Sequence, residues 1–282
     1  MAMKLFKPTT AGRRGMSVVH YRRLLTATNP HKALTAGGKR GVGRNNVGRI
    51  TTRHKGGGVK RNYRLVDFTY NKKDIPAKVE SVEYDPYRSG FIGLICYADG
   101  ERRYVLLPQG VKVGDTVITS DKADIAKGNR LPLKKIPAGT FIYNLELKPN
   151  GGAKLVRSAG VMAEVLANDA GYTNVKLPSS EVRKIIDTAW ASVGAVSNEE
   201  FRLINWGTAG RARKRGIRPT VRGSAMNPVD HPYGGGEGRQ GRGTRRPKTM
   251  WGKVTGGRKT RRAKKYSNVF IVSRRVKKGR KK

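Results

Sequence analysis

The uneven distribution of charge along the chain limits most strongly how it can fold. Residues 1–66 hold 16 Lys and Arg and no acid, and residues 202–282 hold 26 Lys and Arg against Asp230 and Glu237. Residues 67–201, in contrast, hold 18 basic and 17 acidic residues. Like charges at this density oppose compaction, so only the middle is expected to fold as an ordinary globular body. We predict a basic N-terminal extension (1–66), a nearly neutral body (67–201) and a basic C-terminal extension (202–282).

The formal net charge of +41 predicts a polyanionic partner. Nucleic acid is the usual one, because each phosphate contact releases condensed counterions. An anionic membrane is the competing interpretation. However, no stretch approaches the roughly 18 consecutive apolar residues of a spanning helix, and no long basic amphipathic helix is evident. We therefore expect no membrane partner.

The start of the chain bears on its location. Residues 1–10 lack the apolar run of a secretion signal. Residues 1–66 are Arg-rich and acid-free, as in an organelle transit peptide, but their many glycines argue against an amphipathic helix. The lone Cys96 is expected to pack as a small hydrophobe in a reducing compartment. A cytoplasmic location is favoured, with an organelle as the alternative.

The extensions are rich in glycine and poor in apolar residues, so alone they are expected to be disordered. A solvated tail is the simplest interpretation of such runs. Aromatic residues nevertheless interrupt the charge, as in residues 20–23, 205–207 and 250–252. This pattern is typical of segments that become ordered against RNA bases and backbone.

The middle of the chain is predicted to be mainly β, with short strands separated by turns. Asp99-Gly100 between two apolar runs predicts a hairpin with a two-residue turn. The prolines near residue 135 suggest two small barrels, at 67–130 and 131–201. Residues 197–200 have capping-box spacing and predict a short helix. The expected strands are 62–68, 91–98, 101–107, 111–118, 139–147, 154–158, 161–168, 172–177 and 182–186, with Phe141, Tyr143, Leu145 and Leu147 sharing one face.

Catalytic and metal-binding motifs find little support. Residues 236–241 read G-x-G-x-x-G, yet no strand precedes them and no helix-forming run follows. The chain has no phosphate-binding loop of the G-x-x-x-x-G-K-[ST] type. Its one cysteine and four histidines match no zinc-finger spacing. We expect neither a cofactor nor a bound metal of its own, and His20, His31 and His54 are read as RNA contacts within the basic arm.

His231 is the one residue with enzyme-like surroundings, because Asp230 precedes it and a glycine run follows. Asp230 could orient the imidazole for general base chemistry. Alternatively, the segment is an ordered loop that anchors RNA, which we favour because no nucleophile or pocket is evident. Arg88 and Arg157 also stand out, since each follows a strand-like run near a turn. Either each guanidinium binds a phosphate through two parallel hydrogen bonds, or both arginines are exposed charges on barrel loops.

Long motifs occur throughout the chain, at residues 39–45, 53–58, 60–64, 79–86, 207–213, 216–223, 225–232, 251–253 and 267–272. They closely resemble the large-subunit ribosomal protein family L-two in its bacterial form. The resemblance implies that the first barrel is an OB-fold and the second SH3-like, with both extensions threading between rRNA helices. It also implies a structural, non-enzymatic role in subunit joining, tRNA placement and the architecture around the peptidyl-transferase centre.

The resemblance further implies that Arg88 and Arg157 contact rRNA and that His231 lies near the peptidyl-transferase region. One departure matters: Tyr233 stands where the family commonly has a second histidine, so a two-histidine mechanism is in doubt. Lys214 and Arg215 also replace apolar residues expected after Arg213. The residues predicted to bind RNA are Arg88, Arg157, Arg44, Arg53, His54, Lys55, Lys60, Arg211, Arg213, Arg218, Arg222, His231, Arg239, Trp251 and Lys253.

The expected partners are large-subunit rRNA and neighbouring ribosomal proteins, with contacts to the small subunit and tRNA, Mg²⁺ bridging to rRNA, and no homo-oligomer. Two other functions remain open. One is an enzyme in which His231 assists acyl transfer. The other is a nonspecific nucleic-acid condenser, although a condenser has no need of a neutral two-barrel body.

Overall fold

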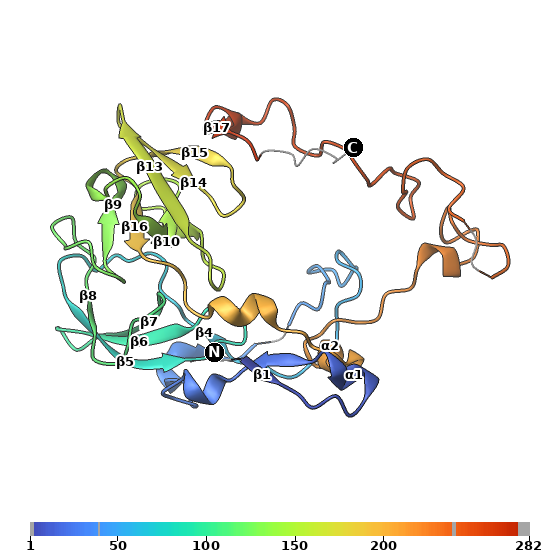
Figure 1. Cartoon of the computed structure of the whole chain (residues 1–282), viewed down its shortest axis with the longest axis horizontal. Coiled ribbons are helices and arrows are strands. Elements are labelled where there is room, and N and C mark those ends of the chain that lie inside the picture. The colour runs from blue at the N-terminus through green and yellow to red at the C-terminus, as the bar shows by residue number, and fades with distance from the viewer. Residues whose placement is uncertain (1–2, 39, 239–240, 276–282) are drawn as a thin grey trace. The chain divides into compact units, whose positions relative to one another are not determined.

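The computed structural model describes residues 3–38, 40–238 and 241–275, and the chain separates into two compact units. The barrel unit comprises Met1–Lys39, Lys60–Thr208 and Val269–Lys282. The extension unit comprises Arg40–Val59 and Ala209–Asn268. Strands dominate the first of these (Figure 1), and the longest described helix, α2 (Ala209–Lys214), has six residues. Within the described ranges, no helix is long and apolar enough to cross a membrane.

The first sheet of the barrel unit has four antiparallel strands in the order β7-β6-β5-β8. These are β5 (Ala77–Glu83), β6 (Ile92–Tyr97), β7 (Arg102–Leu106) and β8 (Thr116–Val117). A register shift between Val79 and Ser81 lets Val79 and Val82 both face the core, although simple alternation would separate them. The sheet curls around a core that includes Ala77, Val79, Val82, Phe91, Ile95, Tyr97, Val105 and Leu107.

The second sheet has seven strands in the order β17-β15-β14-β13-β10-β16-β9, with every neighbouring pair antiparallel. These are β9 (Arg130–Pro132), β10 (Phe141–Tyr143), β13 (Ala163–Asp169), β14 (Tyr172–Lys176), β15 (Val182–Ile186), β16 (Trp190–Val193) and β17 (Ile271–Ser273). Its core is separate and includes Leu131, Leu133, Ile142, Leu145, Val165, Val175, Ile185 and Ala191. The mainly β fold predicted from the sequence is confirmed, and its two curled sheets are consistent with the two expected barrels.

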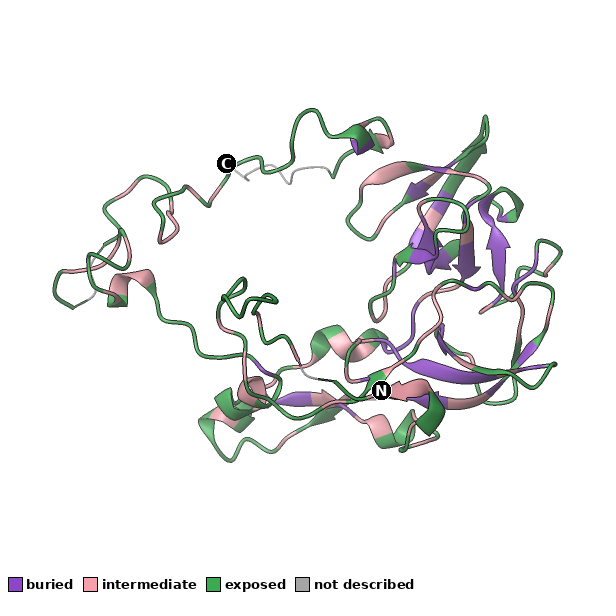
Figure 2. Cartoon of the chain, turned by 180° about the vertical axis from the view of Figure 1, so that it is seen from behind, coloured by how far each residue is buried: buried purple, intermediate pink, exposed green. Residues whose placement is uncertain are grey.

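The basic N-terminal segment also contributes short strands to the barrel unit. In this segment β1 (Met3–Leu5) pairs with β2 (Ser17–Val19), and β3 (Thr35–Ala36) pairs with β4 (Tyr63–Arg64). Outside it, β11 (Leu145–Glu146) pairs with β12 (Ala153–Leu155). Helical turns are α1 (Ala11–Arg14), η1 (Tyr21–Arg23), η2 (Lys32–Leu34), η3 (Leu133–Lys135), η4 (Glu199–Leu203), η5 (Gly223–Ala225) and η6 (Tyr266–Asn268). Buried residues gather on the sheets, whereas residues 241–265 are exposed or half-buried (Figure 2).

The hairpin predicted at Asp99-Gly100 joins β6 to β7, but its turn differs from the expected one. The Gly100 N–H donates to the Tyr97 carbonyl at 2.9 Å, and Tyr97 N–H donates to the Glu101 carbonyl at 2.9 Å. Of the two turn residues, Gly100 alone has a positive φ, at 85°. The connection is therefore a three-residue loop with a left-handed glycine, and the predicted two-residue turn is wrong.

One local prediction in the second half of the body is wrong, and the short helix predicted at residues 197–200 forms without the expected cap. Asn144 adopts a φ of 48°, which ends β10 and moves Leu145 and Leu147 off the face of Phe141. Phe141 is consequently 45 % exposed, whereas Leu145 is buried. At residues 197–200 the helix η4 forms without a side-chain cap. The Ser197 hydroxyl instead accepts the Phe91 N–H at 3.1 Å, because tertiary packing offers it a buried partner.

A buried ion pair that the sequence did not reveal joins β9 of the second sheet to β11. Arg130 and Glu146 are 1 % and 2 % exposed, and Arg130 Nη2 lies 2.8 Å from Glu146 Oε1. Arg130 Nη1 also donates to the Asn144 carbonyl at 2.7 Å, and its Cζ lies 4.4 Å from the ring centre of Tyr70. Removing either partner would leave an uncompensated buried charge, which typically costs about 3–5 kcal/mol.

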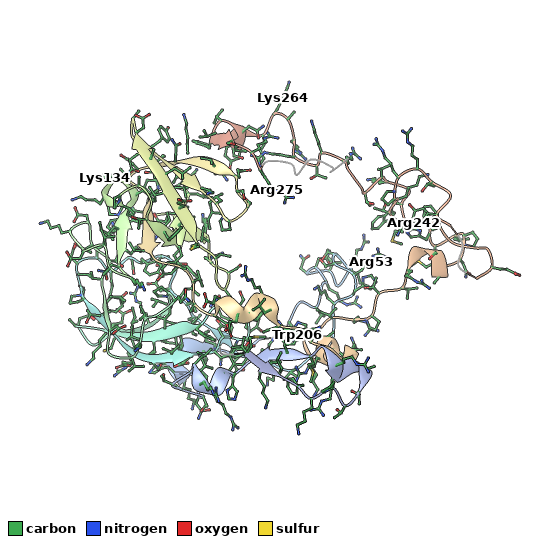
Figure 3. The ribbon with its side chains drawn as sticks, in the orientation of Figure 1. Arg53, Lys134, Trp206, Arg242, Lys264 and Arg275 are labelled. Atoms are coloured by element: carbon green, nitrogen blue, oxygen red, sulfur yellow. The ribbon has the colours of Figure 1, made fainter. Side chains whose placement is uncertain are left out.

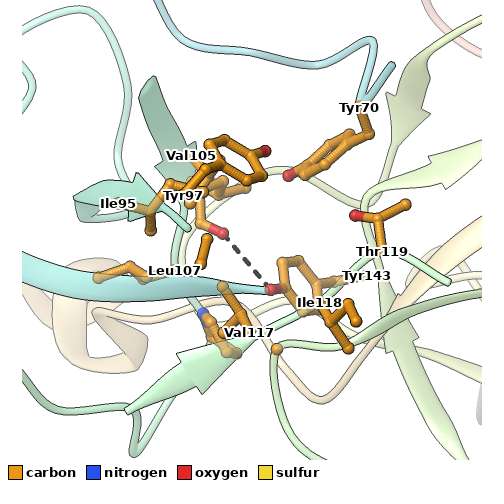
Figure 4. A pocket seen from close by; sticks show the side chains of 13 residues that line it. Tyr70, Ile95, Tyr97, Val105, Leu107, Val117, Ile118, Thr119 and Tyr143 are labelled. Carbon is orange, nitrogen blue, oxygen red and sulfur yellow. Dashed lines mark hydrogen bonds between the residues drawn. The ribbon is translucent and has the colours of Figure 1, made fainter. Parts of the chain in front are cut away.

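A small tyrosine-lined cavity of about 20 Å³ lies in the barrel unit (Figure 4). Tyr70, Tyr97 and Tyr143 line it, and the Tyr143 hydroxyl donates to the Leu106 carbonyl at 3.4 Å. Burial raises the pKa of Tyr97 to about 12, and burial also raises the pKa values of Tyr70 and Tyr143 above their usual range. These hydroxyls are therefore neutral wherever the protein is folded near neutral pH.

Candidate RNA interface

The turn at residues 84–88, between β5 and β6, holds Arg88 in a fixed position. Asp85 is fully buried, and its carboxylate accepts the Tyr87 N–H at 2.8 Å and Nη1 of Arg88 at 2.6 Å. An Asp side chain that bonds to the backbone two residues later is a typical way to close a turn. The Arg88 side chain, 17 % exposed, is thus oriented before any ligand binds.

Arg88 and Arg157 come from different loops and meet at one aromatic ring. Cζ of Arg88 lies 5.3 Å from the ring centre of Phe68, and Cζ of Arg157 lies 4.6 Å from the same centre. A guanidinium over an aromatic ring gains about 0.5–1 kcal/mol at exposed sites. Arg157 has no ion-pair partner among the described residues, so the charge of this cluster is only partly compensated.

The backbone before Arg157 is unusual. Val156 adopts a φ of 56°, a left-handed conformation that is rare for a β-branched residue. Such a conformation typically costs about 1–3 kcal/mol and persists only where the surroundings impose it. Here the Val156 carbonyl accepts the Asn144 N–H at 3.1 Å, and the side chain is buried. Immediately after this left-handed residue, the exposed Arg157 lies next to Phe68.

In the extension unit, two segments distant in sequence pair through their backbones. Lys55 forms an antiparallel bridge with Ile217, and the Arg218 N–H donates to the His54 carbonyl at 3.0 Å. His54 itself adopts a φ of 61°. The predicted RNA-binding residues Lys55, His54 and Arg218 are thereby brought together.

A second contact in the same unit joins Arg53 to Trp251. The Arg53 guanidinium lies 5.7 Å from the indole, which is 70 % exposed. Figure 3 shows long side chains projecting along the C-terminal segment, with Arg242 and Lys264 among those labelled. An exposed indole among cations is a surface on which a base can stack.

His231 lies in a compact loop with a defined hydrogen-bond role. Its Nδ1 accepts the Tyr233 N–H at 3.1 Å, and its ring centre lies 4.9 Å from that of Tyr233. A Cβ at Gly223 would come within 2.5 Å of the imidazole, so the ring covers this glycine closely. The alternative in which Asp230 orients the imidazole finds no support, because no ion pair joins the two among the described residues and the Tyr233 N–H bonds to the ring instead.

Tyr233, the residue that departs from the family pattern, ties its loop to residues 244–248. Its hydroxyl accepts the Lys248 N–H and the Thr244 hydroxyl, the latter at 3.3 Å. The Thr244 hydrogen bond, together with the Lys248 N–H, lowers the pKa of Tyr233. A histidine ring is shorter than a phenol, so this particular connection depends on the tyrosine.

The remaining predicted site residues do not form one cluster. Nη1 of Arg44 donates to the Gly48 carbonyl at 2.9 Å, and Nη1 of Arg213 donates to the Ile217 carbonyl at 3.4 Å. Arg211 is half-buried on α2, while Lys60 in the barrel unit and Arg222 and Lys253 in the extension unit are exposed. Arg239 lies outside the described residues.

Sequence reasoning missed Phe68 and Asp85, the two residues that position the arginine pair. Asp85 precedes a proline in a turn, a pattern that could have indicated a side-chain-to-backbone bond. Phe68 ends an alternating run and was read only as part of a strand. Its role depends on a contact with Arg157, which is 89 positions later in the sequence.

Together these features define an RNA-binding class of protein: neutral β barrels that carry fixed, partly compensated arginines, with glycine-rich cationic extensions. Residues 31–119 match the family model "Ribosomal Proteins L2, RNA binding N-terminal domain". Residues 126–252 match "Ribosomal Proteins L2, C-terminal domain". The chain belongs to the ribosomal protein L2 family, as its resemblance to family L-two indicated. It is a structural, RNA-binding protein of the large ribosomal subunit.

Proposed function

We propose that the chain is a primary rRNA-binding protein whose barrels recognise rRNA through Arg88 and Arg157, and that it is not an enzyme. This proposal rests mainly on one observation: the guanidiniums of Arg88 and Arg157, which come from separate loops, both lie against the ring of Phe68. Guanidiniums bind phosphate through two parallel hydrogen bonds, so a pre-oriented pair suits a folded RNA backbone. The predicted RNA-binding residues of the extensions then consolidate the complex by neutralising further phosphates.

The proposal also covers the roles of the protein within the ribosome. The protein supports subunit association, tRNA placement and the architecture around the peptidyl-transferase centre. Its partners are rRNA, neighbouring ribosomal proteins, the small subunit and tRNA, and Mg²⁺ bridges some contacts with rRNA. It acts in the ribosome of the bacterial cytoplasm, without a membrane or a second copy of itself. The charge of the extensions supports these assignments, since such segments order against RNA.

The arginine pair provides the direct test. We expect the double substitution Arg88→Ala and Arg157→Ala to weaken binding to large-subunit rRNA by about 3 kcal/mol, roughly 100-fold, because each lost charged hydrogen bond contributes about 1.5–3 kcal/mol. The salt dependence should also become shallower by nearly one unit for each lost phosphate contact. Binding isotherms across salt concentrations would measure both quantities.

Lys135→Ala is the matched control, because Lys135 is an exposed cation of the same unit on η3. It should change affinity only slightly. If wild-type protein bound random duplex as tightly as rRNA, with the same salt slope, the chain would be a nonspecific condenser and the proposal would fail. Equal losses for the lysine control and the arginine pair would also count against specific recognition.

A further inference from the structure

Two exposed tyrosines and an arginine form a patch beside the turn that carries Arg88. Tyr63 of β4 is 41 % exposed and Tyr87 is 40 % exposed. Their ring centres lie 5.5 Å apart at an interplanar angle of 75°, and Cζ of Arg61 lies 4.8 Å from the ring centre of Tyr87. Neighbouring aromatic rings that remain this exposed in a folded protein mark an interaction surface.

The patch is ordered before any ligand binds. Nη1 of Arg61 donates to the Pro86 carbonyl at 2.8 Å, and the Tyr87 hydroxyl donates to the Arg61 carbonyl at 3.3 Å. The Tyr87 backbone is fixed in turn by Asp85. Because these side chains are already restrained, binding costs little additional conformational entropy.

The charge of the patch favours an anionic ligand. Arg61 is half-buried and has no ion-pair partner among the described residues, and its Nε is buried without a hydrogen-bond acceptor. Arg103 contrasts with it, since Asp67 and Glu101 both neutralise that arginine. Burial alone would raise the pKa of Asp67, but hydrogen bonds from Thr69 and Arg103 outweigh burial and lower it.

The ring geometry leaves a face for stacking. In a T-shaped pair the edge of one ring meets a face of the other, so at most one face of Tyr63 is covered by Tyr87. Every nucleobase has a flat face that can stack on such a ring, whereas an acidic peptide uses only the charge. The ligand that satisfies both ring and guanidinium is a nucleotide.

We propose that Tyr63, Tyr87 and Arg61 form a stacking site for an unpaired RNA base, with the phosphate of that nucleotide on Arg61. This inference rests on the proposed rRNA binding and adds a base contact to it. Phosphate contacts alone position a duplex, whereas a stacked base selects a loop, bulge or single-stranded end. The patch therefore directs the barrel unit toward an unpaired position in the rRNA.

The test compares full-length variants for binding to large-subunit rRNA. Replacing both tyrosines (Tyr63→Leu with Tyr87→Leu) should weaken binding about 10-fold, the scale of one lost base–aromatic stack. The salt slope should stay unchanged, because no phosphate contact is removed. The pair Tyr63→Phe with Tyr87→Phe keeps both rings and should retain most of the affinity. With rRNA that carries 4-thiouridine, photo-crosslinks of the wild-type protein should map to Tyr63 or Tyr87.

The matched control is Tyr172→Leu, which removes a tyrosine that is 39 % exposed on β14. It should leave affinity unchanged. If the wild type binds rRNA specifically but the double leucine variant binds equally well, the stacking site is refuted while rRNA recognition stands. If the phenylalanine pair loses as much affinity as the leucine pair, stacking is likewise refuted. If the wild type shows no preference for rRNA over random duplex, the proposed function itself fails.

Discussion

At the scale of single residues, the glycines and the tyrosine around His231 explain why this loop resembles a catalytic segment without the geometry of one. The Nδ1 atom of His231 is already engaged by the Tyr233 N–H, so it is not free to accept a proton from a substrate. Gly223 is required beneath the ring, since any Cβ there would overlap the imidazole. Residue types that suggested chemistry therefore also satisfy packing and hydrogen bonding within the loop.

Replacement of this histidine separates the two interpretations. We expect assembled large subunits that carry His231→Ala to form peptide bonds at the wild-type rate, as the proposed anchoring, non-catalytic role of the loop requires. Single-turnover peptide-bond formation, measured on subunits shown to assemble normally, would test this. A rate decrease of about 100-fold or more, the scale of a lost general base, would restore the enzymatic interpretation.

At the scale of elements, turns and short strands matter more than helices. The β6–β7 hairpin depends on one left-handed residue, and the turn at 84–88 depends on one buried carboxylate. Both connections hold strands in a register that buries apolar residues of the first core. The same turn exposes Tyr87 and orients the half-buried Arg88, so fold and candidate site share one element.

The contribution of the left-handed glycine in the β6–β7 hairpin to stability can be tested without a steric clash. A Cβ at Gly100 would meet no atom within 4 Å, so Gly100→Ala changes only the backbone preference at a φ of 85°. We expect the free energy of unfolding to decrease by about 1 kcal/mol, as denaturant titration would measure. Gly37→Ala is the control, because Gly37 is also unobstructed but lacks a positive φ. Equal losses in both variants would show that the turn conformation is not the cause.

At the scale of the whole molecule, charge and hydrophobic burial are separated along the chain. The ion pairs lie mainly in the near-neutral body, for example Arg130–Glu146 and Lys176–Glu164. The extensions hold 42 basic residues against two acids. Stability thus resides largely in the apolar cores of the barrel unit, and we expect affinity for a polyanion to reside largely in the extensions.

The buried tyrosines predict how stability depends on alkaline pH. Tyr97 has its pKa raised by burial to about 12, above the value of about 10 in an unfolded chain. Between these values the folded state holds the proton more tightly, so the free energy of unfolding should fall as pH rises from about 10 to 12. Denaturant titrations across this range should show the decline, and Tyr97→Phe should reduce its slope. A pH-independent free energy would contradict the assignment.

The sequence by itself determined the division of charge, the β class, the position of the β6–β7 hairpin and three strands of the second sheet (β13, β14 and β15). These follow from local composition and alternation, which one segment carries alone. The glycine turn at Asp99-Gly100 was visible as well, although its form was not, and the turn closed by Asp85 was missed. The arginines proposed for RNA binding could be named from their turns and from the family resemblance.

Only the tertiary structure decided which of those residues meet. Three contacts join segments that are distant along the chain. Arg88 and Arg157 both lie against Phe68, Arg130 is buried with Glu146, and β17 pairs with β15. No local pattern encodes such partners, because they depend on how two separate cores bring loops together. Whether an arginine is buried, stacked or free is therefore settled by its neighbours in space.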